Sequence, residues 1–325
     1  MIDGYGRTID YLRISVTDRC NLRCVYCMPP EGVEWMEHAE MLSYEEIIRL
    51  CRLFAAAGIR KVRLTGGEPL ARKGLHHLVR GIRAIDGIDG VSLTTNGVLL
   101  AEQLPDLMDA GLTAVNLSLD TLDREQYAAI TRRDALEDAL AGLRAALAAP
   151  GLHVKLNCVP MGDNDSQLVP LAALARDNDL AVRFIELMPI GLGGALPRRT
   201  EEQVRAMLEE TFGPLSPCSA SFGAGPGHYV TAGGFQGKIG FISAMTHQFC
   251  DQCNRVRLTA TGFLKTCLQY ETGSDLRSLL RDGSDDQVIL SAIRDAISHK
   301  PARHHFNDAA GQSADETHNM NQIGG

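Results

Sequence analysis

Residues 11–32, YLRISVTDRCNLRCVYCMPPEG, join a run typical of a buried β-strand to a loop with three cysteines. Cys20, Cys24 and Cys27, the first cysteine group, have no histidine within ten residues of them. A structural zinc site normally takes four Cys or His ligands, whereas a cubane iron–sulfur cluster takes one thiolate for each iron. Three thiolates leave one of four irons open to another molecule, so the spacing favours a [4Fe-4S] cluster.

Five further strand-like runs follow the first, and segments with helical periodicity separate them. The runs are residues 61–67, 91–96, 114–120, 153–159 and 181–187. Ser43 and Glu46 form a capping box that opens one of the intervening helices. Six βα units predict a parallel α/β sheet with helices outside it, arranged as an incomplete (β/α)6 TIM-type barrel.

The pattern changes after residue 213, where Gly and Pro become frequent and the strand-like runs become shorter. Two such runs, 228–234 and 237–244, precede a second group of cysteines. We expect residues 1–213 to form the partial barrel. Residues 214–325 are expected to form a C-terminal extension that closes the barrel. This extension holds the second group of cysteines, for which a second iron–sulfur cluster is predicted below, and ends in Gly-Gly.

The composition indicates which partners and which cellular compartment to expect for this protein. The 325 residues carry a net charge of -8, which argues against binding nucleic acid or an anionic membrane through general positive potential. No apolar run approaches the roughly 20 residues that span a bilayer, and the N-terminus lacks the apolar core of a signal peptide. We therefore expect a cytoplasmic protein, in which nine cysteines indicate metal binding or catalysis instead of disulfides.

Polar residues follow the predicted strands at their carboxyl ends, where parallel βα folds place their sites. They are Thr65, Gly66, Gly67, Glu68, Thr94, Thr95, Asn96, Ser118, Asp120, Asn157 and Glu186. A single polar residue at a strand end is ordinary, because such ends are exposed to water. Together these residues predict a ligand site at this edge of the sheet.

The second cysteine group repeats the arrangement of the first. It consists of Cys250, Cys253 and Cys267. Three thiolates without a fourth again predict a [4Fe-4S] cluster with one open iron. Arg255 and Arg257 follow at a spacing that places both guanidinium groups on one face of a strand, suited to a phosphate. A zinc site stays open as an alternative, with His247 as the nearest candidate for a fourth ligand.

The CxxxCxxC motif, with Tyr26 before its third cysteine, and GGEP at residues 66–69 resemble the radical S-adenosylmethionine (radical SAM) superfamily. The resemblance implies that the open iron chelates the amino and carboxylate groups of S-adenosylmethionine (SAM). Reduction of the cluster would then release a 5′-deoxyadenosyl radical, so that the cofactor carries the chemistry and the protein positions it.

Both cysteine groups, the strands between them and the Gly-Gly end resemble one family of this superfamily, the GTP 3′,8-cyclases of molybdenum cofactor biosynthesis. The resemblance runs from about Arg7 to Gly325. It implies a lyase in which the adenosyl radical takes the C3′ hydrogen of GTP and the C3′ radical attacks guanine C8. It also implies that the open iron of the second cluster contacts the guanine.

The resemblance assigns binding residues where the local motif is present. Contacts to GTP would fall on Arg13, Arg63, Thr94, Lys155, Arg255, Val256 and Arg257, and contacts to SAM on Tyr26, Gly67, Ser118 and Met188. Arg13, Arg63 and Lys155 lie inside predicted strands, where a charge needs a reason, so they would help to build a triphosphate cage. Gly67 suits close backbone approach by the amino acid moiety, and Met188 suits packing against adenine or in the core.

The end of the chain, NMNQIGG, is polar and would by default be dispensable. The resemblance implies instead that this tail threads into the open barrel, where only glycines offer backbone without side-chain bulk. We therefore expect Gly324 and Gly325 to act catalytically, with the final carboxylate paired to an active-site arginine.

Partners also follow from the resemblance: GTP as substrate, an electron donor, and a cyclic pyranopterin monophosphate synthase that takes the product. Neither nucleic acid nor membrane is expected, and a monomer and a homodimer both stay open. Two other functions remain, a two-cluster radical enzyme that modifies peptides and a non-enzymatic iron or zinc sensor. The peptide-modifying enzyme would share the first motif but not the Arg255–Arg257 pair or the Gly-Gly end.

Overall fold

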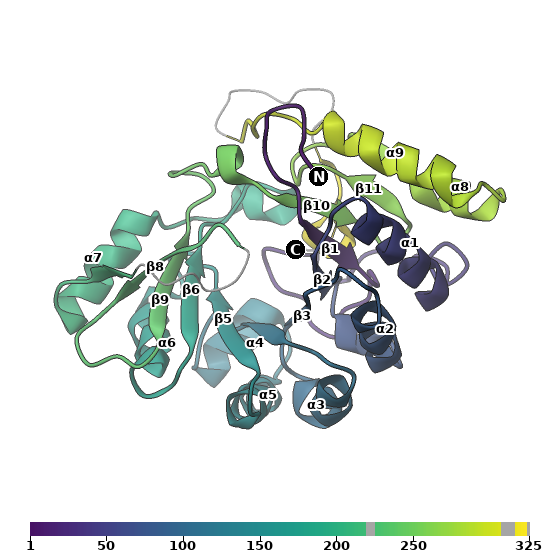
Figure 1. Ribbon diagram of the computed structural model, residues 1–325. Helices are drawn as coiled ribbons and strands as arrows, with labels where there is room; N and C mark the ends of the chain where they lie inside the picture. The colour runs from purple at the N-terminus through teal and green to yellow at the C-terminus, as the bar shows by residue number, and fades with distance from the viewer. Residues whose placement is uncertain (219–224, 307–315, 324–325) are drawn as a thin grey trace.

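One sheet organises the computed structural model, which describes residues 1–218, 225–306 and 316–323. Its strand order is β12-β11-β10-β1-β2-β3-β4-β5-β6-β9-β8-β7 (Figure 1). The central strands are β1 (Tyr11–Ser15), β2 (Lys61–Thr65), β3 (Gly90–Thr95), β4 (Ala114–Ser118), β5 (His153–Cys158) and β6 (Ala181–Ile185). They occupy the six predicted runs and pair in parallel, which confirms the parallel α/β sheet.

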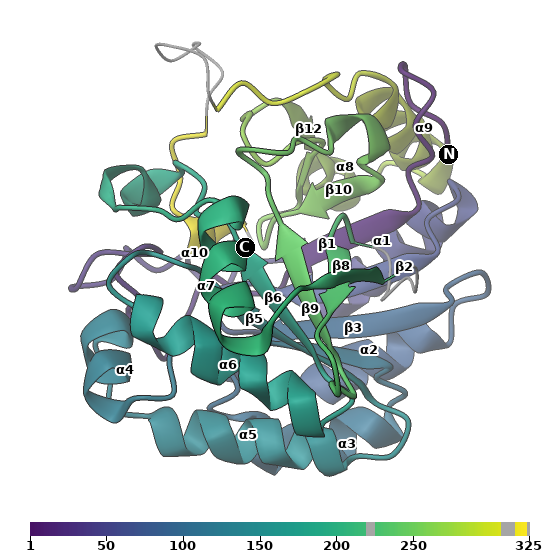
Figure 2. The same cartoon turned by 90° about the vertical axis from the view of Figure 1, so that its left-hand side faces the viewer.

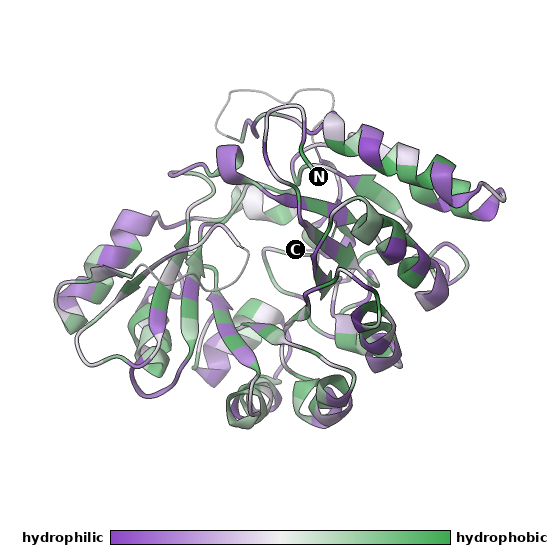
Figure 3. Ribbon diagram, in the orientation of Figure 1, coloured by the Kyte–Doolittle hydropathy of each residue, from purple (hydrophilic) through white to green (hydrophobic). Residues whose placement is uncertain are grey.

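Helices connect the central strands and cover the outside of the curved sheet (Figure 1). They are α1 (Tyr44–Ala56), α2 (Leu75–Arg83), α3 (Leu100–Asp109), α4 (Arg124–Thr131), α5 (Leu136–Ala148), α6 (Asp165–Asp177) and α7 (Glu201–Phe212), with short 3-10 turns η1 (Pro69–Ala71) and η2 (Gly191–Ala195). The predicted capping box of Ser43 and Glu46 is present at α1. In Figure 3 the helices carry both green and purple bands, as amphipathic helices do when one side packs on a core.

The chain after residue 213 lengthens the sheet at both edges. Its strands are β7 (Ser216–Cys218), β8 (His228–Thr231), β9 (Lys238–Ile242), β10 (Arg255–Leu258), β11 (Phe263–Lys265) and β12 (Gly273–Asp275). β9 pairs in parallel with β6, and β10 pairs in parallel with β1, so the parallel part of the sheet is wider than predicted. The remaining strands add an antiparallel hairpin at each edge.

No closed barrel forms in the described residues, contrary to the expectation that the extension would close one. The edge strands β7 and β12 end the sheet on opposite sides and do not pair with each other. The reason is that the extension supplies β9 to one edge and then crosses to supply β10 to the other. The extension therefore completes both sides of an open sheet.

The remaining helices are η3 (Cys250–Gln252), α8 (Leu276–Arg281), α9 (Asp286–Ser298) and α10 (Met320–Ile323). α9 packs beside α1 on the outer side of the sheet (Figure 1). None of the helices described has both the length and the apolar character needed to cross a bilayer.

A buried ion pair ties the N-terminus to later parts of the chain. Arg7 Nε donates to Asp3 Oδ2 at 2.6 Å, and both side chains are buried. The Nη1 group of Arg7 donates to the carbonyl oxygens of Cys250 at 2.9 Å and Ala302 at 2.7 Å. One guanidinium group thus joins segments that lie 243 and 295 residues away along the chain.

Arg7→Met is expected to lower the free energy of unfolding by about 3–5 kcal/mol, because Asp3 would keep a buried charge without its partner. Urea unfolding followed by circular dichroism measures the change. Arg80→Met is the control, since Arg80 forms an exposed pair with Asp109 at 2.7 Å. The control should lower the free energy by less than about 1 kcal/mol, and equal effects of the two variants would contradict the role given to Arg7.

Candidate active site

A cavity opens at the carboxyl ends of the parallel strands, at the edge where the sequence predicts a site. All six central strands or the loops that follow them contribute to its lining. The predicted strand-end residues in the lining are Thr65, Gly66, Gly67, Thr94, Thr95, Asn96, Ser118, Asp120, Asn157 and Glu186. Both cysteine groups line this same cavity, although they are far apart in the sequence.

The first cysteine group lies on the loop after β1, which is fixed by backbone contacts. The N–H of Cys27 donates to the carbonyl oxygen of Cys24 at 2.9 Å and makes a turn. Arg132, at the end of α4, donates from Nη1 to the carbonyl oxygens of Arg23 at 2.9 Å and Met28 at 3.0 Å. Arg132 has a φ of 54°, a conformation that non-glycine residues rarely adopt. The loop is therefore held before any ligand binds.

The cysteines of this group are partly buried in the wall of the cavity. Burial raises the pKa of Cys20 to about 11 and that of Cys27 to about 12. Burial also raises the pKa of Cys24 well above its usual value. Such thiols are neutral near pH 7. A bound metal cation would displace their protons, as happens when cysteines become metal ligands.

Neither cysteine group has the geometry of a single-ion zinc site. Within the described parts of the chain, no three cysteine sulfur atoms lie within 4.8 Å of one another. Zinc with tetrahedral Zn–S bonds of about 2.3 Å requires sulfur atoms about 3.8 Å apart. His247, the candidate fourth ligand, lies 3.6 Å from Glu201 and is not part of the cavity lining. Three thiolates in each group fit a multinuclear cluster with one open iron.

The second cysteine group combines η3 with the turn after β11. The N–H of Cys253 donates to the carbonyl oxygen of Cys250 at 3.1 Å, the same oxygen that Arg7 contacts. Burial raises the pKa of Cys253, but Lys300 and Arg255 outweigh it and lower the pKa to about 7. The cations beside Cys253 therefore favour its thiolate form, which binds iron, whereas burial raises the pKa of Cys250.

A row of arginines crosses three strands beside the cysteines. The strand register pairs Arg257 of β10 with Arg13 of β1, and Arg13 with Arg63 of β2. These three residues, the arginine row, line the cavity together with Arg255. Burial and then Arg257 and Arg63 lower the pKa of Arg13 well below its usual value. Burial and then Arg255 lower that of Arg257 to about 10. Like charges at this depth favour a polyanionic ligand.

Two predicted contacts to GTP do not place a side chain in the cavity. Val256 alternates with the two arginines of β10, so its side chain is fully buried in the hydrophobic core on the other face. Lys155 is buried on β5 and is not in the lining. Burial, followed by Arg183 and Arg63, lowers the pKa of Lys155 to about 7. Thr94 lines the cavity, as predicted.

The residues predicted to contact SAM all line the cavity. They are Tyr26, Gly67, Ser118 and Met188. The Tyr26 hydroxyl donates to Asp120 Oδ2 at 2.7 Å, which fixes the ring. A Cβ atom on Gly67 would lie 2.4 Å from the carbonyl oxygen of Arg19, so the turn needs glycine to pack against the cysteine loop. This gives a reason for Gly67 that the sequence did not indicate.

Glu68 braces the site from behind the lining. Its carboxylate accepts hydrogen bonds from Thr95 Oγ1 at 2.7 Å, from the N–H of Asn96 at 2.8 Å and from the N–H of Leu70 at 3.0 Å. Burial raises the pKa of Glu68 to about 7, and these bonds act in the opposite direction. Asn96, positioned in this way, directs Nδ2 toward Cys20 Sγ at 3.9 Å.

Sequence reasoning missed two cations of the lining. Arg183 donates from Nη2 to Asn116 Oδ1 at 2.7 Å and Asn157 Oδ1 at 2.5 Å. A charged residue inside a predicted strand indicates a site residue, as it does for Arg13. Arg183 lies inside the predicted strand 181–187, so the same pattern predicts it as well. Lys300 follows α9 and donates to the carbonyl oxygen of Thr266. No local pattern marks Lys300.

The C-terminal segment also reaches the cavity. Met320 and Asn321 of α10 belong to the lining, and Figure 2 shows α10 among the central elements of the molecule. Asn321 is a further lining residue that the sequence did not indicate. Gly324 and Gly325, which were predicted to be catalytic, lie outside the described residues.

Known families match both parts of the chain. Residues 14–175 match the radical SAM superfamily, and residues 180–306 match the Molybdenum Cofactor Synthesis C family. Curated relatives named GTP 3′,8-cyclase are 46% identical in Heliobacterium modesticaldum, 47% in Pelotomaculum thermopropionicum and 45% in Desulforamulus reducens. Each of these matches covers 100% of this chain and 100% of the relative.

Solved structures of SuiB from Streptococcus suis share the fold. One has a TM-score of 0.58 at 15% identity and covers 89% of this chain and 68% of that chain. A second, bound to S-adenosylmethionine, has a TM-score of 0.57 at 14% identity, with 88% and 68% covered. The curated relatives are far closer in sequence and match at full length. The chain belongs to the GTP 3′,8-cyclase family of the radical SAM superfamily.

Proposed function

We propose that this chain is a radical SAM lyase that converts GTP to (8S)-3′,8-cyclo-7,8-dihydroguanosine 5′-triphosphate in molybdenum cofactor biosynthesis. The observation that carries the proposal is one cavity lined by two incomplete cysteine groups and the arginine row. Each cysteine group fits a cluster that a small molecule completes, and the arginine row fits a triphosphate. The likeness to SuiB concerns the fold alone, so a peptide substrate is not favoured.

The first cysteine group would hold a [4Fe-4S] cluster. When bound there, the cluster and SAM would supply a 5′-deoxyadenosyl radical. Tyr26, Gly67, Ser118 and Met188 are the proposed SAM contacts. The protein would orient this ligand beside GTP. The hydrogen bonds that Arg132 donates and those that Glu68 accepts support that orientation, because they fix the surrounding loops.

The second cysteine group and the cations beside it would bind GTP. A second [4Fe-4S] cluster there would contact the guanine, and the arginine row with Arg255 would bind the triphosphate. Thr94 would contribute its hydroxyl group, and Val256 could contribute only its backbone. Lys155 is proposed to act from beneath the lining. Burial, followed by Arg183 and Arg63, lowers its pKa, and an anion bound nearby would raise that pKa again.

We divide the chain into a radical SAM core, residues 1–213, and an extension, residues 214–325, that carries the second cluster and the Gly-Gly tail. The core would be an incomplete (β/α)6 barrel. Support comes from the strands that the extension adds at both edges of the sheet, whereas the two family models meet earlier, between residues 175 and 180. The extension would fold onto the core instead of folding as an independent domain.

The proposed setting is the cytoplasm, with neither nucleic acid nor membrane as a partner. An electron donor would reduce the first cluster, and a cyclic pyranopterin monophosphate synthase would take the product. The protein would act as a monomer or a homodimer. The net charge of -8 supports small anions held by local cations over long anionic polymers.

Cys24→Ala is expected to abolish cleavage of SAM, because the first cluster would lose one of only three protein ligands. Cys267→Ala is the matched variant, which should keep some SAM cleavage and lose cyclisation of GTP. The measurement is anaerobic incubation of reconstituted protein with SAM, dithionite and GTP, with 5′-deoxyadenosine and the cyclised nucleotide quantified separately. Normal 5′-deoxyadenosine formation by Cys24→Ala, or wild-type cyclisation by Cys267→Ala, would overturn the corresponding cluster assignment.

Arg255→Ala or Arg257→Ala should weaken GTP binding by about 1.5–3 kcal/mol, or roughly 10- to 150-fold, because a charge-assisted phosphate contact is lost. Binding of SAM should change by less than about twofold. Calorimetry with each ligand measures both constants, and iron analysis checks that the second cluster stays bound. If both ligands weaken equally, these arginines do not bind the triphosphate.

Deletion of Gly324 and Gly325 should leave iron content and SAM binding intact while cyclisation falls by about 100-fold or more, since loss of positioned groups at a reacting centre has effects of this size. Addition of one residue after Gly325 should have the same effect. Product analysis of both variants against the full chain tests this. Full cyclisation by the truncated protein would show that the tail is dispensable.

A further inference from the structure

The last described segment, residues 316–323, is attached to the rest of the molecule at two separate places. Its outer end, Glu316 to His318, contacts the chain around Lys265 and Glu271. Its inner end, in α10, contacts the loop of the first cysteine group. Neither attachment is explained by the proposed chemistry, and both involve side chains that the sequence did not single out.

A buried ion pair makes the outer attachment. Lys265 Nζ contacts Glu316 Oε2, and their side chains are only 3% and 1% exposed. Lys265 also donates to the carbonyl oxygen of Tyr270 at 2.6 Å, and the N–H of Glu316 donates to the carbonyl oxygen of Gln269 at 2.5 Å. Lys265 lies on β11, two residues before Cys267, so the pair is adjacent to the second cysteine group.

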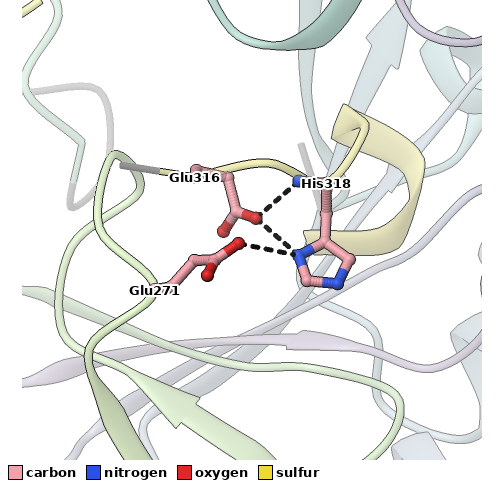
Figure 4. Close-up of side chains that lie close together, drawn as sticks. All are labelled: Glu271, Glu316 and His318. Carbon is pink, nitrogen blue, oxygen red and sulfur yellow. Dashed lines mark hydrogen bonds and ion pairs between the residues drawn. The ribbon is translucent and has the colours of Figure 1, made fainter. Parts of the chain in front are cut away.

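Figure 4 shows further contacts that involve Glu316, with His318 and Glu271 beside it. His318 Nδ1 lies 2.7 Å from Glu316 Oε1 and 3.6 Å from Glu271 Oε1. The N–H of Thr317 donates to Glu271 Oε1 at 3.1 Å. Ligand atoms of Glu271, Glu316 and His318 lie within 4.8 Å of one another, as in a metal site. Lys265 already neutralises the charge of Glu316, however, so these contacts dock the segment without a metal ion.

Asn321 makes the inner attachment. It is 1% exposed, and its Nδ2 donates to the carbonyl oxygen of Asp18 at 3.1 Å. Since a carbonyl oxygen only accepts, this bond fixes which side of the amide faces Asp18. Asp18 lies two residues before Cys20, and Asn321 lines the same cavity as Cys20 and Cys27 of the first cysteine group. Asn319 packs against Gly191, where a Cβ atom would lie 2.8 Å from Asn319 Oδ1.

We propose that residues 316–323 form a docked strap, in which the Lys265–Glu316 pair fixes one end and Asn321 is a positioning residue for the first cluster at the other. The strap joins the surroundings of Cys267 to those of Cys27. It rests on the proposed function, because the cluster that Asn321 would influence is part of that function. Solvent access and the contacts that orient the ligand loop both affect a cluster's reduction potential, and Asn321, which is buried against that loop, bears on both.

The charge pair is tested by exchange of backbone amides in the reconstituted holoenzyme. Lys265→Met and Glu316→Gln should each raise the exchange rates of residues 316–323 by about 100-fold or more, since each leaves a buried charge alone. The double variant should recover much of the loss, because no charge is left unpaired. Asp109→Asn, which breaks the exposed pair with Arg80, is the control and should change nothing.

Asn321 is tested by a readout of the first cluster. Asn321→Ala should raise amide exchange of residues 320–323 with less effect on residues 316–318, since the outer attachment remains. The midpoint potential of the electron paramagnetic resonance signal that SAM perturbs should shift from the wild-type value. Lys265→Met should shift it as well, and the double variant with Glu316→Gln should return it toward wild type.

Three results would overturn the proposal. The first is wild-type exchange in Lys265→Met and Glu316→Gln, and the second is raised exchange with an unchanged cluster potential in Asn321→Ala. The third is a strap that docks only when zinc is added and is released by a chelator, which would make Glu271, Glu316 and His318 a metal site. The proposed function is tested separately, since it fails if the wild-type protein does not cyclise GTP.

Discussion

Parallel pairing of the strands is the constraint on which the rest of the structure depends. Because β10, β1 to β6 and β9 all run in one direction, their carboxyl ends meet at a single edge. The parallel register between β1, β2 and β10 also places Arg13, Arg63 and Arg257 side by side. Two cysteine groups from opposite ends of the chain can therefore face one cavity, and phosphate-binding cations lie beside them.

The cavity combines two opposite electrostatic environments. The first cysteine group is partly buried with raised thiol pKa values, so these thiols ionise when a cation binds. The arginine row brings three like charges together, and burial lowers the pKa of Arg13 and Arg257, so this part of the cavity favours an anion. Each environment raises the free energy of the empty site, and its own ligand lowers that free energy again. The site can therefore select an iron–sulfur cluster at one place and a polyphosphate at another.

Local periodicity made much of this predictable. The six strands, the capping box and the shared face of Arg255 and Arg257 follow from residues close together in the sequence. The same alternation placed Val256 on the opposite face, and only the family resemblance suggested that it contacts a ligand. Other features depend on contacts between distant segments, which short sequence patterns do not encode. These are the open sheet, the parallel pairing of β9 with β6 and of β10 with β1, and the approach of Lys300 and Asn321 to the cavity.

The pairing of β1 with β10 has a consequence for how the chain is made. Tyr11 leaves the ribosome among the first residues, and its partner Arg255 is among the last hundred. At about 5–20 residues per second, β1 would remain an unpaired edge for roughly 10–50 s. The edge of β6 stays open for a shorter time, until β9 is made. Exposed edges are templates for association between chains, so the nascent protein must reach its final strands before it meets another copy of itself.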